Sequence, residues 1–188
     1  MKNKLAKCRV YLCGAVERKV EQEWRTRITK LCENRFHMTV YNPLIKPRWM
    51  PIISGKTQQK MYEELINGDQ RQITNAMIKS KNNMTRMYCL ALSRNADIII
   101  LHYDHKAHTV GTFEEITSNS HKPIFVLAEK KKVSMWLIDQ LDLYSAVNRN
   151  VYLHFSLDSL GAALDAINRG DIDVKFDPFK WIFLTHGG

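Results

Sequence analysis

The sequence predicts an α/β fold in which one parallel sheet is sandwiched between helices, a doubly wound arrangement. Short runs of apolar and β-branched residues alternate along the chain with longer segments of helical periodicity. Two of these runs, ADIIILHY (96–103) and KPIFVLAE (122–129), are apolar almost throughout, as is typical of strands buried on both faces of a parallel sheet. With 188 residues, of which 45% are hydrophobic, the chain is long enough to bury one core.

The remaining strands are predicted from shorter β-rich runs that end in Gly or Pro or precede a helix. They are CRVYLCG (8–14), MTVYNP (38–43) and VYLHF (151–155). Helices are predicted from apolar residues at helical spacing, and they cover residues 19–33, 57–67, 70–80, 83–95, 111–120, 134–142 and 156–170. For the last helix, Ser156 is a suitable N-cap and Gly170 lies near the C-terminal end. This alternation indicates a flavodoxin-like or Rossmann-like sheet.

No linker, repeat or low-complexity segment divides the chain, so the prediction is a single domain over residues 1–188. Its core covers about residues 8–165. The aromatic tail, residues 171–188, lies outside the alternation. Such a tail either packs back on its own chain or forms an interface with a partner.

The net charge of +9 and the pI of about 9.4 favour anionic ligands, which include polynucleotides and small phosphorylated molecules. The basic residues are spread along the chain, and no basic motif interleaved with aromatic residues favours nucleic acid. No apolar run approaches the ~20 residues that a membrane span needs, and the N-terminal sequence is not typical of a signal peptide.

The four cysteines show neither CxxC spacing nor histidines at ligand distances; they are Cys8, Cys13, Cys32 and Cys89. This pattern indicates free thiols in a cytoplasmic protein, with no metal and no cofactor. His102, His105 and His108 cluster in one loop, where solvated side chains are expected in preference to a metal site.

In a doubly wound sheet a ligand binds beyond the carboxyl ends of the strands, where the strand order reverses. The loops at residues 13–19 and 103–111 follow the first strand and the Asp97 strand. Gly111 allows a close backbone approach, and the amides near Gly111 and Thr112 begin a helix whose N-terminus favours an anion.

Glu114 and Glu115 follow in the same helix, about 100° apart, so only one of them can face a pocket. Glu115 with Asp97 would supply a nucleophilic carboxylate and a second acidic group, the pair used to cleave a glycosidic bond with retention. Each residue also has a structural interpretation. A glutamate in the first turn stabilises a helix, an aspartate beside a strand caps a turn, and Tyr11 on the first strand packs in a core.

Five motifs occur in order, namely VYLCGAVER (10–18), YNP (41–43), NADIIIL (95–101), TVGTFEE (109–115) and KPIFVL (122–127). Together they resemble the nucleoside 2-deoxyribosyltransferase superfamily over residues 8–165. Their pattern is closest to the 2′-deoxynucleoside 5′-phosphate N-hydrolases.

The resemblance implies that Glu115 attacks C1′ of a 2′-deoxynucleoside, with Asp97 as the family's aspartate and Tyr11 as the aromatic residue that orients the glutamate. Thr109 stands where transferases carry an aspartate and monophosphate hydrolases carry a serine. A hydroxyl can donate a hydrogen bond to a phosphate, whereas an aspartate would repel it.

Gly14, Arg18 and Lys19 are expected to meet the same anion. Tyr88 replaces an aspartate that many relatives carry, which favours a non-catalytic alternative.

The main hypothesis is therefore an N-glycosidase acting on 2′-deoxynucleoside 5′-monophosphates through a glutamyl-deoxyribosyl intermediate. The alternatives are a base-exchanging 2-deoxyribosyltransferase, a non-catalytic nucleotide-binding protein on the same fold, and a polynucleotide-binding protein. The expected partner is a small deoxynucleotide or nucleoside, and the resemblance implies a homodimer or larger homo-oligomer.

Overall fold

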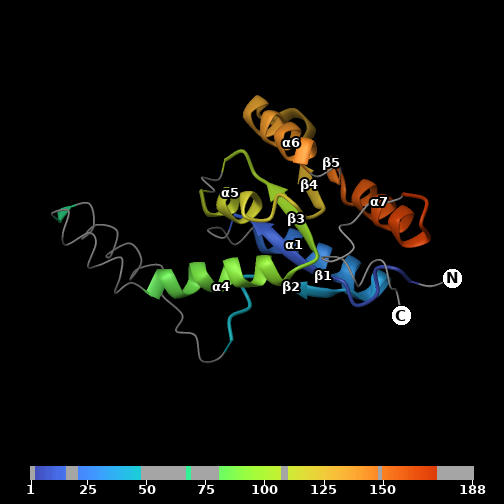
Figure 1. Cartoon of the computed structure of the whole chain (residues 1–188), viewed down its shortest axis with the longest axis horizontal. Coiled ribbons are helices and arrows are strands. Elements are labelled where there is room, and N and C mark those ends of the chain that lie inside the picture. The colour runs from blue at the N-terminus through green and yellow to red at the C-terminus, as the bar shows by residue number, and fades with distance from the viewer. Residues whose placement is uncertain are drawn as a thin grey trace.

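The computed structural model describes residues 3–15, 21–47, 67–68, 81–106, 110–147 and 150–172. Within this part of the chain, five parallel strands form one sheet in the order β2-β1-β3-β4-β5 (Figure 1). The strands are β1 (Arg9–Gly14), β2 (Thr39–Tyr41), β3 (Ile98–Tyr103), β4 (Ile124–Ala128) and β5 (Val151–His154). The predicted α/β class and the parallel sheet are therefore confirmed.

Helices connect the strands and cover both faces of the sheet (Figure 1). They are α1 (Glu21–Lys30), which continues into a π-helical turn η1 (Leu31–Arg35), α4 (Lys81–Asn95), α5 (Val110–Thr117), a 3₁₀ turn η2 (Lys130–Lys132), α6 (Met135–Val147) and α7 (Leu157–Arg169). The predicted helices at 57–67 and 70–80 lie almost entirely outside the described residues, as do residues 173–188 of the aromatic tail. None of the helices described is both long and apolar enough to cross a membrane.

Several predicted bounds differ from the structure by a few residues, and two of these differences have a visible cause. Strand β2 is shorter than predicted because Asn42 turns the chain, with its side-chain oxygen accepting from the Leu44 amide at 3.0 Å. Helix α6 is longer than predicted because its buried face continues from Leu137 and Leu141 to Tyr144.

The alternation of side chains along β1 divides the core into two layers. Val10 and Leu12 face α1 and α7, whose buried residues include Ile28 and Leu164. Tyr11 and Cys13 point to the opposite face and join a second cluster that holds residues of α5 and α6. The sheet is thus buried on both sides, as the continuous apolar runs of β3 and β4 require.

The capping residues predicted for the last helix are confirmed. The Ser156 side chain accepts a hydrogen bond from the Ser159 amide at 3.1 Å, and Gly170 adopts the left-handed conformation with φ +86° after the last turn. Both ends of α7 are therefore specified by local sequence.

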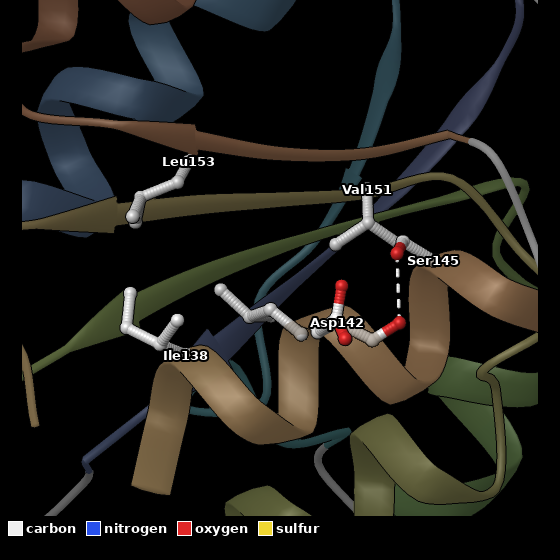
Figure 2. A pocket seen from close by; sticks show the side chains of 6 residues that line it. Ile138, Asp142, Ser145, Val151 and Leu153 are labelled. Carbon is white, nitrogen blue, oxygen red and sulfur yellow. Dashed lines mark hydrogen bonds between the residues drawn. The ribbon is translucent and has the colours of Figure 1, made fainter. Parts of the chain in front are cut away.

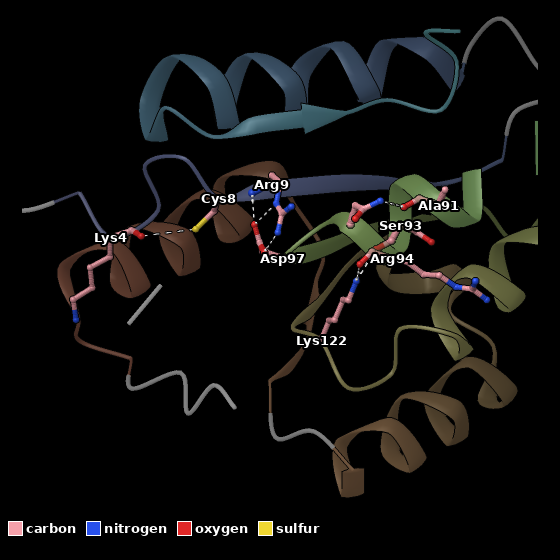
Figure 3. Close-up of polar contacts among 9 residues, drawn as sticks. Lys4, Cys8, Arg9, Ala91, Ser93, Arg94, Asp97 and Lys122 are labelled. Atoms are coloured by element: carbon pink, nitrogen blue, oxygen red, sulfur yellow. Dashed lines mark hydrogen bonds and ion pairs between the residues drawn. The ribbon is translucent and has the colours of Figure 1, made fainter. Parts of the chain in front are cut away.

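A buried lysine that is not part of α4 caps the C-terminal end of this helix (Figure 3). The Lys122 ammonium, 6% exposed, donates to the Ser93 and Arg94 carbonyls at 2.8 and 2.6 Å. Asn119, fully buried in the turn after α5, donates hydrogen bonds to Ser93 Oγ and to the Glu115 carbonyl. These contacts fix α5 against α4.

The strand order reverses between β1 and β3, because β2 lies on one side of β1 and β3 lies on the other. At this point Gly14 pairs with His102. Gly14 has φ +150°, and a Cβ there would lie 2.9 Å from the His102 carbonyl oxygen and 3.0 Å from the Trp24 ring. Only glycine fits this approach.

Candidate active site

Glu115 extends from α5 to β1, where each of its carboxylate oxygens accepts one hydrogen bond. The Tyr11 hydroxyl donates to Oε1 at 2.8 Å, and the Cys13 thiol donates to Oε2 at 3.0 Å. Both donors lie on the same face of β1 because they are two residues apart, and both are fully buried. The carboxylate is therefore held in one orientation near the carboxyl end of β1, beside the point where the strand order reverses.

Burial is the main influence on the ionisation of this cluster. It raises the pKa of Glu115, and hydrogen bonds from Cys13 and Tyr11 together with the Arg25 guanidinium partly offset that rise. Burial also raises the pKa of Tyr11 and of Cys13, both well above their usual ranges. Both side chains therefore stay protonated and remain hydrogen-bond donors to the carboxylate.

Arg25 fixes the end of β1 behind this cluster. It is 1% exposed, and its guanidinium donates to the Gly14 and Ala15 carbonyls at 2.9 and 2.8 Å. It also lies over the Trp24 ring at 4.4 Å. The buried cation thus shapes the start of the loop after β1 and stabilises the ionised form of Glu115.

Glu114 faces the other way. Its carboxylate accepts from Arg86 of α4, with Nε to Oε2 at 2.8 Å. This hydrogen bond from Arg86 is the main reason that the pKa of Glu114 is lowered. The two side chains thus point in different directions, as neighbouring positions in a helix require, with Glu115 inward and Glu114 outward.

Asp97 does not join Glu115. It lies just before β3, at the amino end of the strand, where its carboxylate accepts from the Arg9 amide at 2.8 Å and from the Arg9 guanidinium at 2.8 and 3.0 Å (Figure 3). It is 2% exposed. Ligands bind at the carboxyl ends of such strands. The expected pairing of two catalytic carboxylates is therefore corrected, because Asp97 joins β1 to β3 at the opposite end of the sheet.

The expected anion-binding residues are placed as follows. Gly111 lies in the first turn of α5 and is exposed. Among the described residues, no atom outside the backbone of this helix lies within 4 Å of the position that a Cβ would occupy. Thr112 is 7% exposed, so its side chain is buried, and its carbonyl oxygen lies 3.7 Å from Cys13 Sγ. Arg18, Lys19 and Thr109 lie outside the described residues.

Two further side chains of the site were not predicted. The Lys46 ammonium, from the loop after β2, donates to Cys89 Sγ of α4 at 3.6 Å. Cys89 in turn interacts electrostatically with Tyr11 and Glu115. No local pattern marks either residue. Cys13, in contrast, could have been predicted, since it is two positions after Tyr11 on the same strand.

Aromatic packing accounts for one of the three clustered histidines. The His102 ring stacks on Trp24, with centroids 4.7 Å apart. His105 Nδ1 lies 3.6 Å from Asp104 Oδ1, while His108 lies outside the described residues. In the described part of the chain, no group of three His, Cys, Asp or Glu residues is arranged to hold a metal ion.

A hollow of about 250 Å³ lies elsewhere, between α6 and the edge strand β5 (Figure 2). Its walls are mainly apolar, with Asp142 and Ser145 as polar residues, and the Ser145 hydroxyl donates to the Asp142 carbonyl at 2.7 Å. Strands β3 and β4 separate β5 from β1 in the sheet. The hollow is therefore distinct from the cluster around Glu115.

No protein-family model matches the sequence, and no curated protein matches it either. Among solved structures, the chain is similar to a 2-deoxyribosyltransferase of Bacillus psychrosaccharolyticus, with 12% identity, a TM-score of 0.47, and coverage of 84% of this chain and 96% of that one. A conserved protein of Enterococcus faecalis V583 shows 13% identity and a TM-score of 0.49, over 85% and 98% of the two chains. A CMP N-glycosidase of Clostridium botulinum shows 19% identity and a TM-score of 0.45, over 84% and 98%. At such identities a likeness concerns the fold alone, so only the residues around Glu115 bear on function.

Proposed function

We propose that this chain is an N-glycosidase that cleaves the base–sugar bond of 2′-deoxynucleoside 5′-monophosphates through a covalent glutamyl-deoxyribosyl intermediate. The observation that carries the proposal is the placement of Glu115. Its carboxylate is held by Tyr11 and Cys13 beside the point where the strand order of the sheet reverses. The motifs that resemble deoxynucleotide N-hydrolases include this same glutamate.

In the first step, a Glu115 oxygen bonds to C1′ of the deoxyribose while the C1′–N bond breaks and its electron pair leaves with the base. The two donors hold the carboxylate in place, so little reorganisation is needed for attack. In the second step, water attacks C1′, and the glutamate departs as a carboxylate that accepts again from Tyr11 and Cys13. The products are the free base and the sugar phosphate.

The expected substrate is phosphorylated because of residues that the sequence provides after the first strand and after the Asp97 strand. Thr109 has a hydroxyl that can donate to a phosphate, and Arg18 and Lys19 carry charges of the required sign. Gly111 is exposed in the first turn of α5, and no described residue outside the helix fills the space beside it, where a helix N-terminus favours an anion. The net charge of +9 would attract such a substrate.

The test is base release from a panel of deoxynucleoside monophosphates and the matching deoxynucleosides, with wild type beside Glu115→Ala and Glu114→Ala. The expected result is base release from monophosphates that is abolished by Glu115→Ala and nearly unchanged by Glu114→Ala. Acid quenching during turnover should trap the covalent intermediate, in which the Glu115 carboxylate is esterified to C1′ of deoxyribose 5-phosphate. Mass spectrometry should detect the added mass on the peptide that contains Glu115.

Three other outcomes would contradict parts of the proposal. Base exchange on unphosphorylated nucleosides would identify a transferase and remove the role given to Thr109. Activity in Glu115→Ala together with loss in Glu114→Ala would show that Glu114 is the nucleophile. Binding of deoxynucleotides with no release from any of them would identify a binding protein.

A further inference from the structure

Cleavage of an N-glycosidic bond leaves an electron pair on the departing base, and enzymes commonly supply a proton to such a leaving group. Asp97 was the expected acid, but its carboxylate is bound to Arg9 at the amino end of β3. A donor to the base at this site is therefore a side chain other than Asp97.

Lys46 is a donor of the right kind at the carboxyl edge of the sheet. It follows β2, in a turn closed by hydrogen bonds from the Ile45 and Leu44 amides to the main chain and side chain of Asn42, both at 3.0 Å. Its ammonium is held in place by Cys89 Sγ at 3.6 Å and lies 5.2 Å from the centroid of the Tyr88 ring. A lysine ammonium has three N–H donors and can give up a proton.

Cys89, which accepts from the Lys46 ammonium, links Lys46 electrostatically to the glutamate. Cys89 is half-buried on α4 and interacts with Tyr11 and Glu115, while Tyr41 at the end of β2 pairs with Tyr11 on β1. Lys46 thus reaches the site from the β2 side. In the sequence, the residues expected to bind phosphate follow β1 and β3, not β2.

We propose that Lys46 is the acid that protonates the departing base, with Cys89 holding its ammonium in position. The proposal rests on the N-glycosidase function proposed above. As the C1′–N bond breaks, a proton passes from Lys46 to the base, which leaves as a neutral molecule, and Lys46 becomes a neutral amine. Hydrolysis of the glutamyl ester consumes one water and releases one proton, which restores the Lys46 ammonium.

The experiment compares two substrates in wild type, Lys46→Met and Lys46→Arg. One is the deoxynucleotide that the panel identifies, and the other carries an electron-withdrawing substituent on the same base, which makes the base a better leaving group. Lys46→Met should reduce kcat by about 100-fold or more for the first substrate, the usual size of a general-acid effect. The loss should be several-fold smaller for the second substrate, whose base needs the proton less. Lys46→Arg should stay impaired, because a guanidinium does not give up its proton.

Arg86→Gln is the matched control, since Arg86 is an exposed cation one turn from Cys89 that pairs with Glu114. It should act on both substrates almost as wild type does.

A readout independent of activity is the alkylation of Cys89, the half-buried thiol among the four cysteines. Burial raises the pKa of Cys89, and the Lys46 ammonium partly offsets this rise. Lys46→Met should therefore leave less of Cys89 as the reactive thiolate and slow its alkylation at a given pH.

Several results would overturn the assignment. An equal loss with both substrates, or recovery of activity in Lys46→Arg, would exclude proton transfer from Lys46. A loss confined to phosphorylated substrates would show that Lys46 binds the phosphate. If wild type releases no base from any substrate, the N-glycosidase function fails and the role of Lys46 fails with it. If wild type is active and Lys46→Met is also fully active, only the role of Lys46 fails.

Discussion

The hydroxyl of Tyr11 lies 2.8 Å from Oε1 of Glu115 and joins two residues that are 104 positions apart in the chain. The contact places a protonated phenol against a carboxylate in a buried layer between β1 and α5. Cys13 completes the arrangement on the second oxygen.

Replacing Tyr11 with Phe removes one of the two donors to Glu115. A hydrogen bond to a charged group is worth about 1.5–3 kcal/mol, so base release should fall about 10- to 100-fold. The pKa of Glu115 should rise further, because the hydroxyl lowers it in the wild type. The acid limb of kcat/KM should therefore move to higher pH, which a pH–rate profile measures.

Tyr144→Phe provides the control for that variant. Tyr144 is also buried, and its hydroxyl is hydrogen-bonded to Thr117 Oγ1 at 2.8 Å, in the same core layer. It should lose stability without a shift of the pH profile. Identical profiles for Tyr11→Phe and wild type would mean that Tyr11 does not influence the ionisation of Glu115.

Replacing Glu115 with Gln should increase stability at neutral pH. The folded protein raises the pKa of Glu115 above its unfolded value, so folding disfavours the ionised carboxylate. The contribution of the glutamate is fully favourable below its unfolded pKa of about 4.3 and is lost as the pH rises through the folded value. The gain of Glu115→Gln over wild type should thus be present at pH 7.5 and vanish near pH 4.

Urea unfolding of the two proteins at several pH values measures this difference. A stability difference that does not change with pH would show that Glu115 is not destabilised by its burial. Because the measurement needs no substrate, it tests the environment of Glu115 independently of any catalytic role.

Asp97→Ala should act on stability and not on chemistry. It leaves the Arg9 guanidinium and amide without the partner to which they donate, and breaking a buried pair costs about 3–5 kcal/mol. Arg9 retains 33% exposure, so the loss should lie near the lower end of this range. The fraction that stays folded, measured by thermal unfolding, should release base at the wild-type rate per folded molecule.

A double variant in which apolar residues replace both Arg9 and Asp97 should recover part of that loss, since no charge is then left unpaired. A folded Asp97→Asn protein with normal thermal stability and no activity would contradict the structural role assigned to Asp97. It would return the aspartate to the catalytic machinery.

Gly111→Ala tests whether a ligand approaches the first turn of α5. In the described part of the chain, no atom outside the helix backbone lies within 4 Å of the added methyl group, and alanine favours a helix over glycine by up to about 1 kcal/mol. The free energy of unfolding should therefore stay the same or increase. Base release should nevertheless fall, chiefly through a higher KM, because the methyl group would occupy the space of the anion.

Gly161→Ala serves as the comparison, because Gly161 lies in α7, where the nearest atom is 3.7 Å from an added Cβ and belongs to Leu31. It should leave KM unchanged. Equal effects of the two substitutions on KM would exclude a specific ligand approach at Gly111.

Local patterns in the sequence determined helices and strands of this fold and the two residues of β1 that bind Glu115. Apolar runs specified β3 and β4, Ser156 and Gly170 specified the ends of α7, and the alternation along β1 placed Tyr11 and Cys13 on one face. These features depend on residues within a few positions of one another, so they can be predicted from the sequence alone.

Only the tertiary structure decided which distant residues meet. Asp97 is separated from its partner Arg9 by 88 positions, and Lys46 from Cys89 by 43. Asp97 lies just before β3, and Glu115 lies in α5, which follows β3. The two carboxylates therefore lie toward opposite ends of the parallel strands. Burial, which raises the pKa of Glu115 and keeps Tyr11 and Cys13 protonated, likewise arises only when α5 packs on β1.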